Sequence, residues 1–137
     1  MKKVILLIIL LGTLSCTENK EEQLKHLNGY WEIEEVISEH QTKTYTFSET
    51  IDYIVINDSL KGFRQKLKPR FDGQFETNNV KEQIELKIEN DSLNLYYKTA
   101  FSKFKETIIK VTDAVLIIKN NQNTTYKYKR YQPFNLD

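Results

Sequence analysis

The side chains that most often carry catalysis or bind metals are scarce in this 137-residue chain. It has one cysteine, Cys16, and two histidines, His26 in a polar segment that predicts a tether and His40 in a predicted loop. A metal site or a catalytic triad needs several such groups converging on one point. Neighbouring carboxylates such as Glu34 and Glu35 point to opposite faces of a strand. We therefore expect no enzyme activity, no catalytic or metal site and no cofactor.

Cys16 is the one reactive side chain with an informative setting. It follows a positive start, Lys2 and Lys3, and an uninterrupted run of eight aliphatic residues over 4–11. This run is far shorter than the ~20 apolar residues of a membrane-spanning helix, so the layout is typical of a cleaved secretory signal helix. A lone cysteine in an exported chain has no disulfide partner and needs another explanation.

The residues that end at Cys16 resemble the lipobox of bacterial lipoproteins, with Ser15 at the small position and Thr13 where the family favours leucine. The resemblance implies a lipoprotein signal peptide over residues 1–15, cleavage before Cys16, and acyl chains such as palmitate on Cys16. One acyl chain anchors only marginally, whereas several chains on one residue hold a protein at a membrane. We expect a lipid-anchored protein of the bacterial cell envelope at the outer membrane, on either its periplasmic or its surface face. The alternative is that Cys16 is an ordinary residue after a plain cleavage site.

Residues 16–26 are mostly polar and charged and predict a solvated tether. Within them, Lys20-Glu21-Glu22 either belongs to that tether or acts as an acid-rich surface-export tag, which it resembles. Without Lys2 and Lys3 the chain carries 18 basic and 19 acidic residues. A balance so close to neutral gives no reason to expect nucleic acid as a partner.

Residues 27–134 have the pattern of a single β-rich domain. Short runs of β-branched and aromatic residues alternate with turn signals, and residues 83–89 alternate cleanly between polar and apolar side chains. No long amphipathic helix is predicted. The pattern favours an all-β fold, an antiparallel meander of about 8–10 strands. Closure into a small barrel would remove the two exposed sheet edges.

The first strand of this domain opens with the motif Gly29-x-Trp31, after a short helical turn suggested by Leu24 and Leu27. The motif resembles the start of lipocalin-like proteins. The resemblance implies that Trp31 lies at the closed end of the barrel and that an arginine from the last strand, here Arg130, stacks across it. Such a cation–π contact contributes about 0.5–2 kcal/mol. The alternative is a core tryptophan with Arg130 on the surface.

Two turn signals carry further expectations. Asp72-Gly73 predicts a two-residue hairpin turn in which both residues have positive φ. The phrase Asn-Asp-Ser-Leu occurs twice, at residues 57–60 and 90–93, each after an apolar strand. We favour turn formation for both copies because Asn, Asp and Ser bond to their own backbone. The alternative is O-glycosylation of Ser59 or Ser92, since Asp-Ser-Leu resembles a bacterial glycosylation signal.

Cations recur at every second position of the segment around residues 64–70. On a strand they share one face, while Phe63 and Leu67 share the other. The face would be either a stripe for an anionic partner or, as we favour, a solvated face. Its members are Arg64, Lys66, Lys68 and Arg70. If the barrel closes, Lys127 and Lys129 on the last strand would oppose Glu32 and Glu34 on the first.

Tyrosines suit a binding cavity because they combine apolar area with a hydroxyl group. The candidate ligand-binding residues are Tyr53, Arg64, Tyr97 and Tyr128. We expect a binding module that takes a small apolar or amphipathic ligand in the barrel mouth. The alternative is an interaction or inhibitor protein with a filled barrel, which binds an envelope partner through its outer faces. An interior cavity of about 300 Å³ or more would favour the first function, and a packed interior would favour the second.

Overall fold

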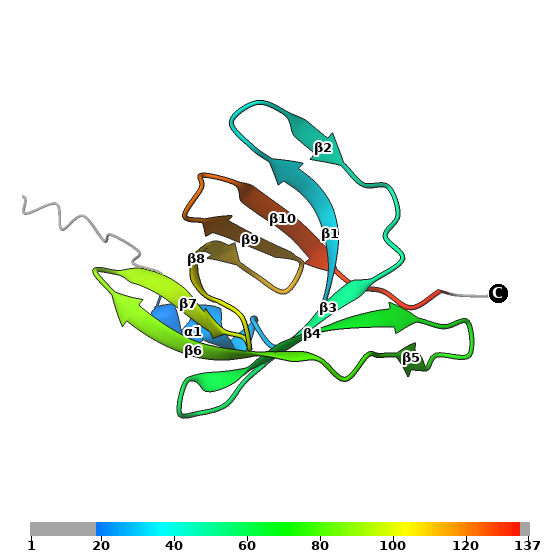
Figure 1. Cartoon of the computed structure of the whole chain (residues 1–137), viewed down its shortest axis with the longest axis horizontal. Coiled ribbons are helices and arrows are strands. Elements are labelled where there is room, and N and C mark those ends of the chain that lie inside the picture. Colours follow the sequence, from blue (N-terminus) through cyan, green and yellow to red (C-terminus); the bar gives the residue numbers. More distant parts are fainter. Residues whose placement is uncertain (1–18, 135–137) are drawn as a thin grey trace, which may run out of the picture.

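The computed structural model describes residues 19–134 (Figure 1). The predicted signal peptide over residues 1–15 and the predicted lipid attachment at Cys16 lie outside the described residues. One short helix, α1 (Lys20–Lys25), comes first. The strands that follow are β1 (Gly29–Ile37), β2 (Thr42–Thr44), β3 (Ile51–Ile56), β4 (Lys61–Pro69), β5 (Phe75–Glu76), β6 (Lys81–Glu89), β7 (Ser92–Lys98), β8 (Lys103–Val111), β9 (Val115–Asn120) and β10 (Thr125–Arg130).

The predicted closed antiparallel barrel is confirmed. Its eight strands are β1, β3, β4, β6, β7, β8, β9 and β10, each paired antiparallel with its neighbour. The first and last strands pair directly, with Trp31 opposite Arg130, so the sheet has no open edge at this point. The two short strands lie off the barrel path: β2 pairs with β1 and β5 pairs with β4. Among the described residues no helix is long and apolar enough to cross a membrane.

The alternating pattern of the strands builds the core. In the β6–β7 pair, Leu86 lies opposite Leu95, and in the β8–β9 pair, Ile108 lies opposite Ile118. All four side chains are buried and point into the barrel, where apolar burial supplies most of the stabilisation. Charged residues at the intervening positions of β6, such as Glu85 and Lys87, are exposed.

Helix α1 covers one end of this core. The Asn19 side chain caps it by accepting a hydrogen bond from the Glu21 amide at 3.0 Å. Glu21 and Glu22 occupy the first turn, where the negative charge of acidic side chains interacts favourably with the helix dipole. Leu24 packs against the core, and Leu27 just after the helix is fully buried. The segment 16–26, predicted as a tether, therefore ends in a helix that belongs to the folded domain.

A bulge in β1 corrects the predicted pairing of charges across the closing strands. Lys129 lies opposite Glu32, and the Lys129 Nζ is 3.7 Å from the Glu32 Oε2. The register then shifts between Ile33 and Glu35, so that Lys127 lies opposite Glu35 rather than Glu34. One extra residue in a strand moves every later pair by one position, which strand periodicity alone does not reveal.

The predicted Asp72-Gly73 turn is also different in detail. Gly73 has a φ of 80°, whereas Asp72 is not among the residues with positive φ. The Arg70 amide donates to the Gln74 carbonyl, so the β4–β5 loop contains three residues instead of two. A three-residue loop needs only one left-handed residue, and glycine supplies it.

The two Asn-Asp-Ser-Leu copies form turns of different geometry. In the first, the Asn57 side chain accepts hydrogen bonds from the amides of Ser59 and Lys61 at 3.0 and 3.1 Å. In the second, Asn90 and Asp91 both have positive φ and connect the paired residues Glu89 and Ser92. Turn formation accounts for both copies, and glycosylation at Ser59 or Ser92 stays a prediction.

Candidate functional site

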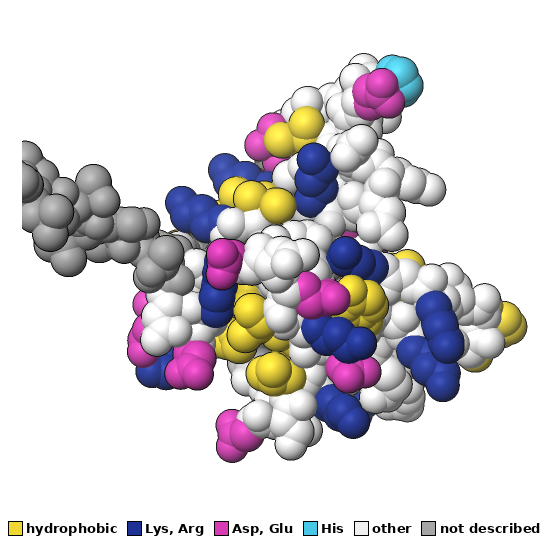
Figure 2. All heavy atoms as spheres, turned by 90° about the vertical axis from the view of Figure 1, so that its left-hand side faces the viewer, with side chains coloured by type: hydrophobic (Ala, Val, Ile, Leu, Met, Phe, Trp, Pro, Cys, Tyr) yellow, Lys and Arg dark blue, Asp and Glu magenta, His cyan; other side chains and the backbone are white. Residues whose placement is uncertain are grey.

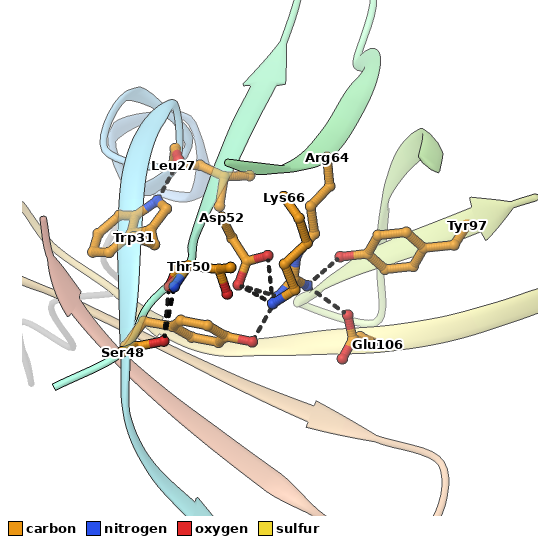
Figure 3. A network of polar contacts seen from close by, with 10 residues as sticks. Leu27, Trp31, Ser48, Thr50, Asp52, Arg64, Lys66, Tyr97 and Glu106 are labelled. Atoms are coloured by element: carbon orange, nitrogen blue, oxygen red, sulfur yellow. Dashed lines mark hydrogen bonds and ion pairs between the residues drawn. The ribbon is translucent and has the colours of Figure 1, made fainter. Parts of the chain in front are cut away.

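A buried arginine occupies the barrel interior. Arg64 on β4 is only 8% exposed, so the predicted solvated face is wrong at this position. Its guanidinium donates to two carboxylates and two phenol oxygens (Figure 3). The distances are 3.2 Å to the Asp52 Oδ2, 3.2 Å to the Glu106 Oε1, 3.2 Å to the Tyr97 hydroxyl and 2.6 Å to the Tyr128 hydroxyl. We call these five residues the Arg64 cluster.

Each member of the Arg64 cluster comes from a different strand. Asp52 lies on β3, Tyr97 on β7, Glu106 on β8 and Tyr128 on β10, and all point inward from around the barrel. Lys66, two residues after Arg64 on the same face, places its Nζ 3.0 Å from the Asp52 Oδ1. Its side chain is 62% exposed, so it reaches the cluster from the solvent side. The predicted stripe is therefore divided between the interior and the surface.

The charges of the cluster compensate one another. Burial alone would raise the pKa of Asp52, but the positive charges of Arg64 and Lys66 outweigh it and lower that pKa. Burial would likewise favour neutral Arg64, yet its partners raise its pKa well above the usual value. Burial raises the pKa of Tyr128 to about 12 and raises that of Tyr97 further, so both phenols are neutral at physiological pH.

This arrangement closes the barrel interior. Among the described residues every buried side-chain nitrogen or oxygen has a hydrogen-bond partner. The Tyr97 ring also stacks on Phe104, with 4.6 Å between ring centroids, and so fills space beside the cluster. A buried charge network that is fully satisfied is a structural element, because a ligand that took one partner would leave another buried charge unpaired.

The structure brings together three of the four predicted ligand-binding residues and separates the fourth. Arg64, Tyr97 and Tyr128 meet in the interior, whereas Tyr53 lies on the outer face of β3. Tyr53 stacks on Tyr30 at 4.6 Å between ring centroids, and Tyr30 stacks on Phe75 of β5 at 5.1 Å. Tyr53 therefore belongs to an external aromatic cluster.

The second arginine site lies at the barrel end covered by α1. The Arg130 guanidinium sits over the Trp31 ring at 3.7 Å from its centroid, and Trp31 is fully buried. Arg130 donates to the carbonyls of His26, Asn28 and Asp113 at 2.7, 3.1 and 2.8 Å. The Trp31 indole donates to the Leu27 carbonyl at 2.9 Å. These bonds connect α1, β1, the β8–β9 turn and β10.

Gly29 makes this stacking possible. Its φ is +132°, a conformation that residues with a side chain rarely adopt. A Cβ at this position would lie 2.5 Å from the Arg130 Nη1, which is too close for any contact. The Gly-x-Trp motif and Arg130 are therefore parts of a single packing arrangement.

An open hollow lies on the outer surface of the barrel. It is an open groove of about 760 Å³ that runs across the outer faces of β4, β6, β7 and β8. Cross-strand register builds it: Tyr96 lies between Glu85 and Lys105, and Lys98 lies between Gln83 and Lys103. We call it the lysine groove after its five lysines, which are Lys61, Lys87, Lys98, Lys103 and Lys105.

The lysine groove has an unbalanced charge. Its lining holds one carboxylate, Glu85, against the five lysines, and none of these five makes an ion pair with a described residue. The outward-facing aromatic side chains of its lining are Phe63 and Tyr96, whereas Tyr97 points inward to Arg64 with Phe104 stacked on its ring. The Nζ atoms of Lys87 and Lys105 lie 4.9 and 5.8 Å from the Tyr96 ring centroid. Figure 2 shows a face of the molecule on which hydrophobic side chains lie among Lys and Arg side chains, with Asp and Glu side chains between them.

Sequence reasoning missed this groove although the signal was present. Lys103 and Lys105 alternate along β8, and Lys98 ends β7 with the same outward direction as Tyr96. Only the register shows that these positions are neighbours across strands.

A second exposed feature is a group of three phenylalanines that we call the phenylalanine patch. Phe47, Phe71 and Phe134 are 58%, 76% and 47% exposed. The ring centroid of Phe134 is 6.1 Å from that of Phe47 and 5.6 Å from that of Phe71. The three residues come from distant parts of the chain, and a pocket of about 60 Å³ lies beside Phe47 and Phe134.

The described residues contain no group of three His, Cys, Asp or Glu side chains placed to hold a metal ion. The family model for the lipocalin-like domain matches residues 27–118, which cover β1 to most of β9. No curated protein and no solved structure matches the chain.

Proposed function

The chain belongs to the lipocalin-like domain family, and we propose that it is a lipid-anchored binding module of the bacterial cell envelope that takes a small amphipathic ligand in the lysine groove. A lipocalin-like barrel fits a ligand-binding module. The observation that carries the proposal is the contrast between a satisfied interior and an open, unpaired outer groove.

The size and lining of the groove support this assignment. Its volume of about 760 Å³ lies within the range of roughly 300–1,000 Å³ typical of small-molecule sites. Tyr96 and Phe63 offer apolar surface beside polar and charged groups, which suits a ligand with both kinds of surface.

The interior is the less favourable place for a ligand. A molecule there would have to displace Tyr97 or Tyr128 from Arg64 and so leave polar groups buried without partners. Leaving one buried donor or acceptor unpaired costs about 1–3 kcal/mol, and more for charged groups.

Binding of the neutral fluorophore N-phenyl-1-naphthylamine tests the location of the site. We expect its fluorescence to rise with the native protein and its affinity to fall by about fivefold in Tyr96→Ser, because a lost aromatic contact contributes about 1 kcal/mol. Phe71→Ser removes an exposed aromatic ring elsewhere and should bind like the native protein. An unchanged affinity in Tyr96→Ser would place the ligand outside the groove.

The lipid anchor belongs to this proposal through Cys16. Acyl chains there would hold the domain at a membrane through α1, whose first residue lies four positions later. The mature protein, extracted from bacterial membranes, should carry the added mass of fatty acyl chains, and Cys16→Ser should release it into the soluble fraction. A mature native protein without acyl mass would rule out the anchor and leave the groove unaffected.

The phenylalanine patch favours a second candidate function, binding of an envelope protein through the outer surface. Exposed apolar patches bordered by polar residues are typical of protein interfaces. In Figure 1 the β4–β5 loop, which carries Phe71, lies on the side of the barrel away from α1, so an anchor before α1 would turn this end away from the membrane. Cross-linking in cell envelopes should capture a protein with the native chain but not with Phe71→Ser/Phe134→Ser. Phe101→Ser, which changes a fully exposed single ring, is the matched control.

A further inference from the structure

We propose that the lysine groove selects ligands with an anionic headgroup, a phosphate or a carboxylate, attached to a single apolar chain. This inference rests on the proposed function, because it names the chemical class of the ligand that the groove binds.

Charge is the first observation behind it. Elsewhere in the described structure, two lysines of the barrel pair with carboxylates: Lys66 with Asp52 at 3.0 Å and Lys129 with Glu32 at 3.7 Å. In the groove, one glutamate stands against five lysines that make no ion pair with described residues. The field of these five cations favours an anion in the groove.

The arrangement of the lysines is the second observation. Lys98 and Lys103 lie directly opposite each other in the β7–β8 pair. Like charges in this position destabilise a sheet. An anion bound between the two ammonium groups would remove that repulsion and gain two charge-assisted hydrogen bonds. This pair is therefore the headgroup site within the groove.

The apolar part of the ligand has a matching surface next to this pair. Tyr96 is two residues before Lys98 on the same outer face of β7, and Phe63 lies opposite Gln83, which in turn lies opposite Lys98. A headgroup at Lys98 and Lys103 would leave the attached chain lying along Tyr96 and Phe63. The groove opens to solvent, so one chain fits it without entering the barrel.

Calorimetric titration with three probes tests the inference. Dodecyl phosphate carries both an anionic head and a single chain, dodecyl maltoside keeps the chain with a neutral head, and inorganic phosphate is the anion alone. Below the micelle concentrations, we expect the native protein to bind dodecyl phosphate at least about tenfold more tightly than either other probe. Its affinity should also weaken as salt is added, since exposed charges are screened.

The variants localise the effect. Lys98→Gln/Lys103→Gln should lose about tenfold in affinity for dodecyl phosphate and keep its affinity for dodecyl maltoside. Lys110→Gln/Lys119→Gln makes the same change of charge on exposed lysines of β8 and β9 outside the groove, and should bind like the native protein.

Each of the other outcomes overturns the inference, the proposed amphipathic ligand, or both. Equal affinity for dodecyl phosphate and dodecyl maltoside, unchanged in Lys98→Gln/Lys103→Gln, would overturn anion selection and leave the proposed binding function standing. Inorganic phosphate binding as tightly as dodecyl phosphate would identify a site for the free anion and overturn the amphipathic ligand. Failure of all three probes to bind would overturn both the inference and the proposed function.

Discussion

Two arginines pack against aromatic rings in this barrel, and they differ in location and in the groups that they bind. Arg130 covers Trp31 at the end closed by α1 and donates to three backbone carbonyls. Arg64 lies inside the barrel and donates to two carboxylates and two phenols. The first joins chain segments that are more than 100 residues apart, and the second compensates buried charge.

The pKa values of the two arginines shift in opposite directions. Partial burial lowers the pKa of Arg130, which has no carboxylate among its hydrogen-bond partners. Arg64 is more deeply buried, yet its pKa is raised because its partners stabilise the charge. The comparison shows that an arginine can close a barrel end through backbone carbonyls, whereas an arginine in the interior requires anionic partners.

The largest effect should follow from removing Arg64. Arg64→Met fills similar space but leaves Asp52 and Glu106 buried without their main counter-charge, so we expect a loss of about 3–5 kcal/mol in the free energy of unfolding. Urea denaturation measures it. A loss below about 1 kcal/mol would show that the cluster is solvated and that the interior is not closed by it.

The next effect is the loss of stability at alkaline pH. The folded state holds the Tyr128 proton up to about pH 12, whereas a free tyrosine loses it near pH 10. Between these values the folded state binds more protons, so the free energy of unfolding is intact below pH 10 and falls as the pH rises towards 12. Two pH units correspond to roughly 3 kcal/mol for this group. Denaturation curves across this range should show a smaller fall in Tyr128→Phe, and an equal fall would contradict the burial of this phenol.

A smaller effect should come from the closed end. Gly29→Ala forces a side chain into a φ of +132° and against the Arg130 guanidinium, so we expect a loss of about 2 kcal/mol. Gly73→Ala is the matched control, because its φ is also positive but a Cβ there meets no atom within 4 Å. Both variants should lose stability because of strained backbone, and only Gly29→Ala should also change the fluorescence spectrum of Trp31. If the Trp31 spectra of Gly29→Ala and the native protein are the same, Gly29 does not support the stacking of Arg130 on Trp31.

The smallest effect should be at the solvent side of the interior cluster. Lys66→Met removes an ammonium group that is largely exposed although it contacts Asp52. Screening by solvent limits the loss to about 1 kcal/mol or less. Urea denaturation of Lys66→Met and Arg64→Met side by side compares the two losses in the free energy of unfolding. A much smaller loss for Lys66→Met would show that the burial of the cation, and not its contact with Asp52, sets the loss; equal losses would contradict this.

The closed end was accessible from the sequence because the short motif Gly29-x-Trp31 resembles the start of lipocalin-like proteins, which implied that Arg130 stacks on Trp31. The structure confirms this contact, with Trp31 opposite Arg130 in the β1–β10 pair. The Arg64 cluster was not accessible in this way. Its five members come from five strands. They meet only if all the strand pairs around the closed barrel have the correct register, including the pairs that contain the bulges in β1 and β8.

The direction of Arg64 was mispredicted for a further physical reason. Phe63 and Leu67 suggested that their own face of β4 pointed to the core. That face is instead covered from outside by aromatic rings, with Tyr53 packed on Phe63 and on Tyr30. Apolar residues therefore occupy both faces of β4, and alternation does not show which face is interior.

The closed interior and the open lysine groove are tested most directly by one measurement, a titration of the labelled protein with dodecyl phosphate followed by amide and aromatic NMR signals. We expect the amide signals of Tyr96, Lys98 and Lys103 to shift progressively, while the ring signals of Tyr128, which is buried and does not line the groove, stay in place. Large shifts of the Tyr128 ring without change in the groove would show that the ligand enters the barrel, and would contradict the account.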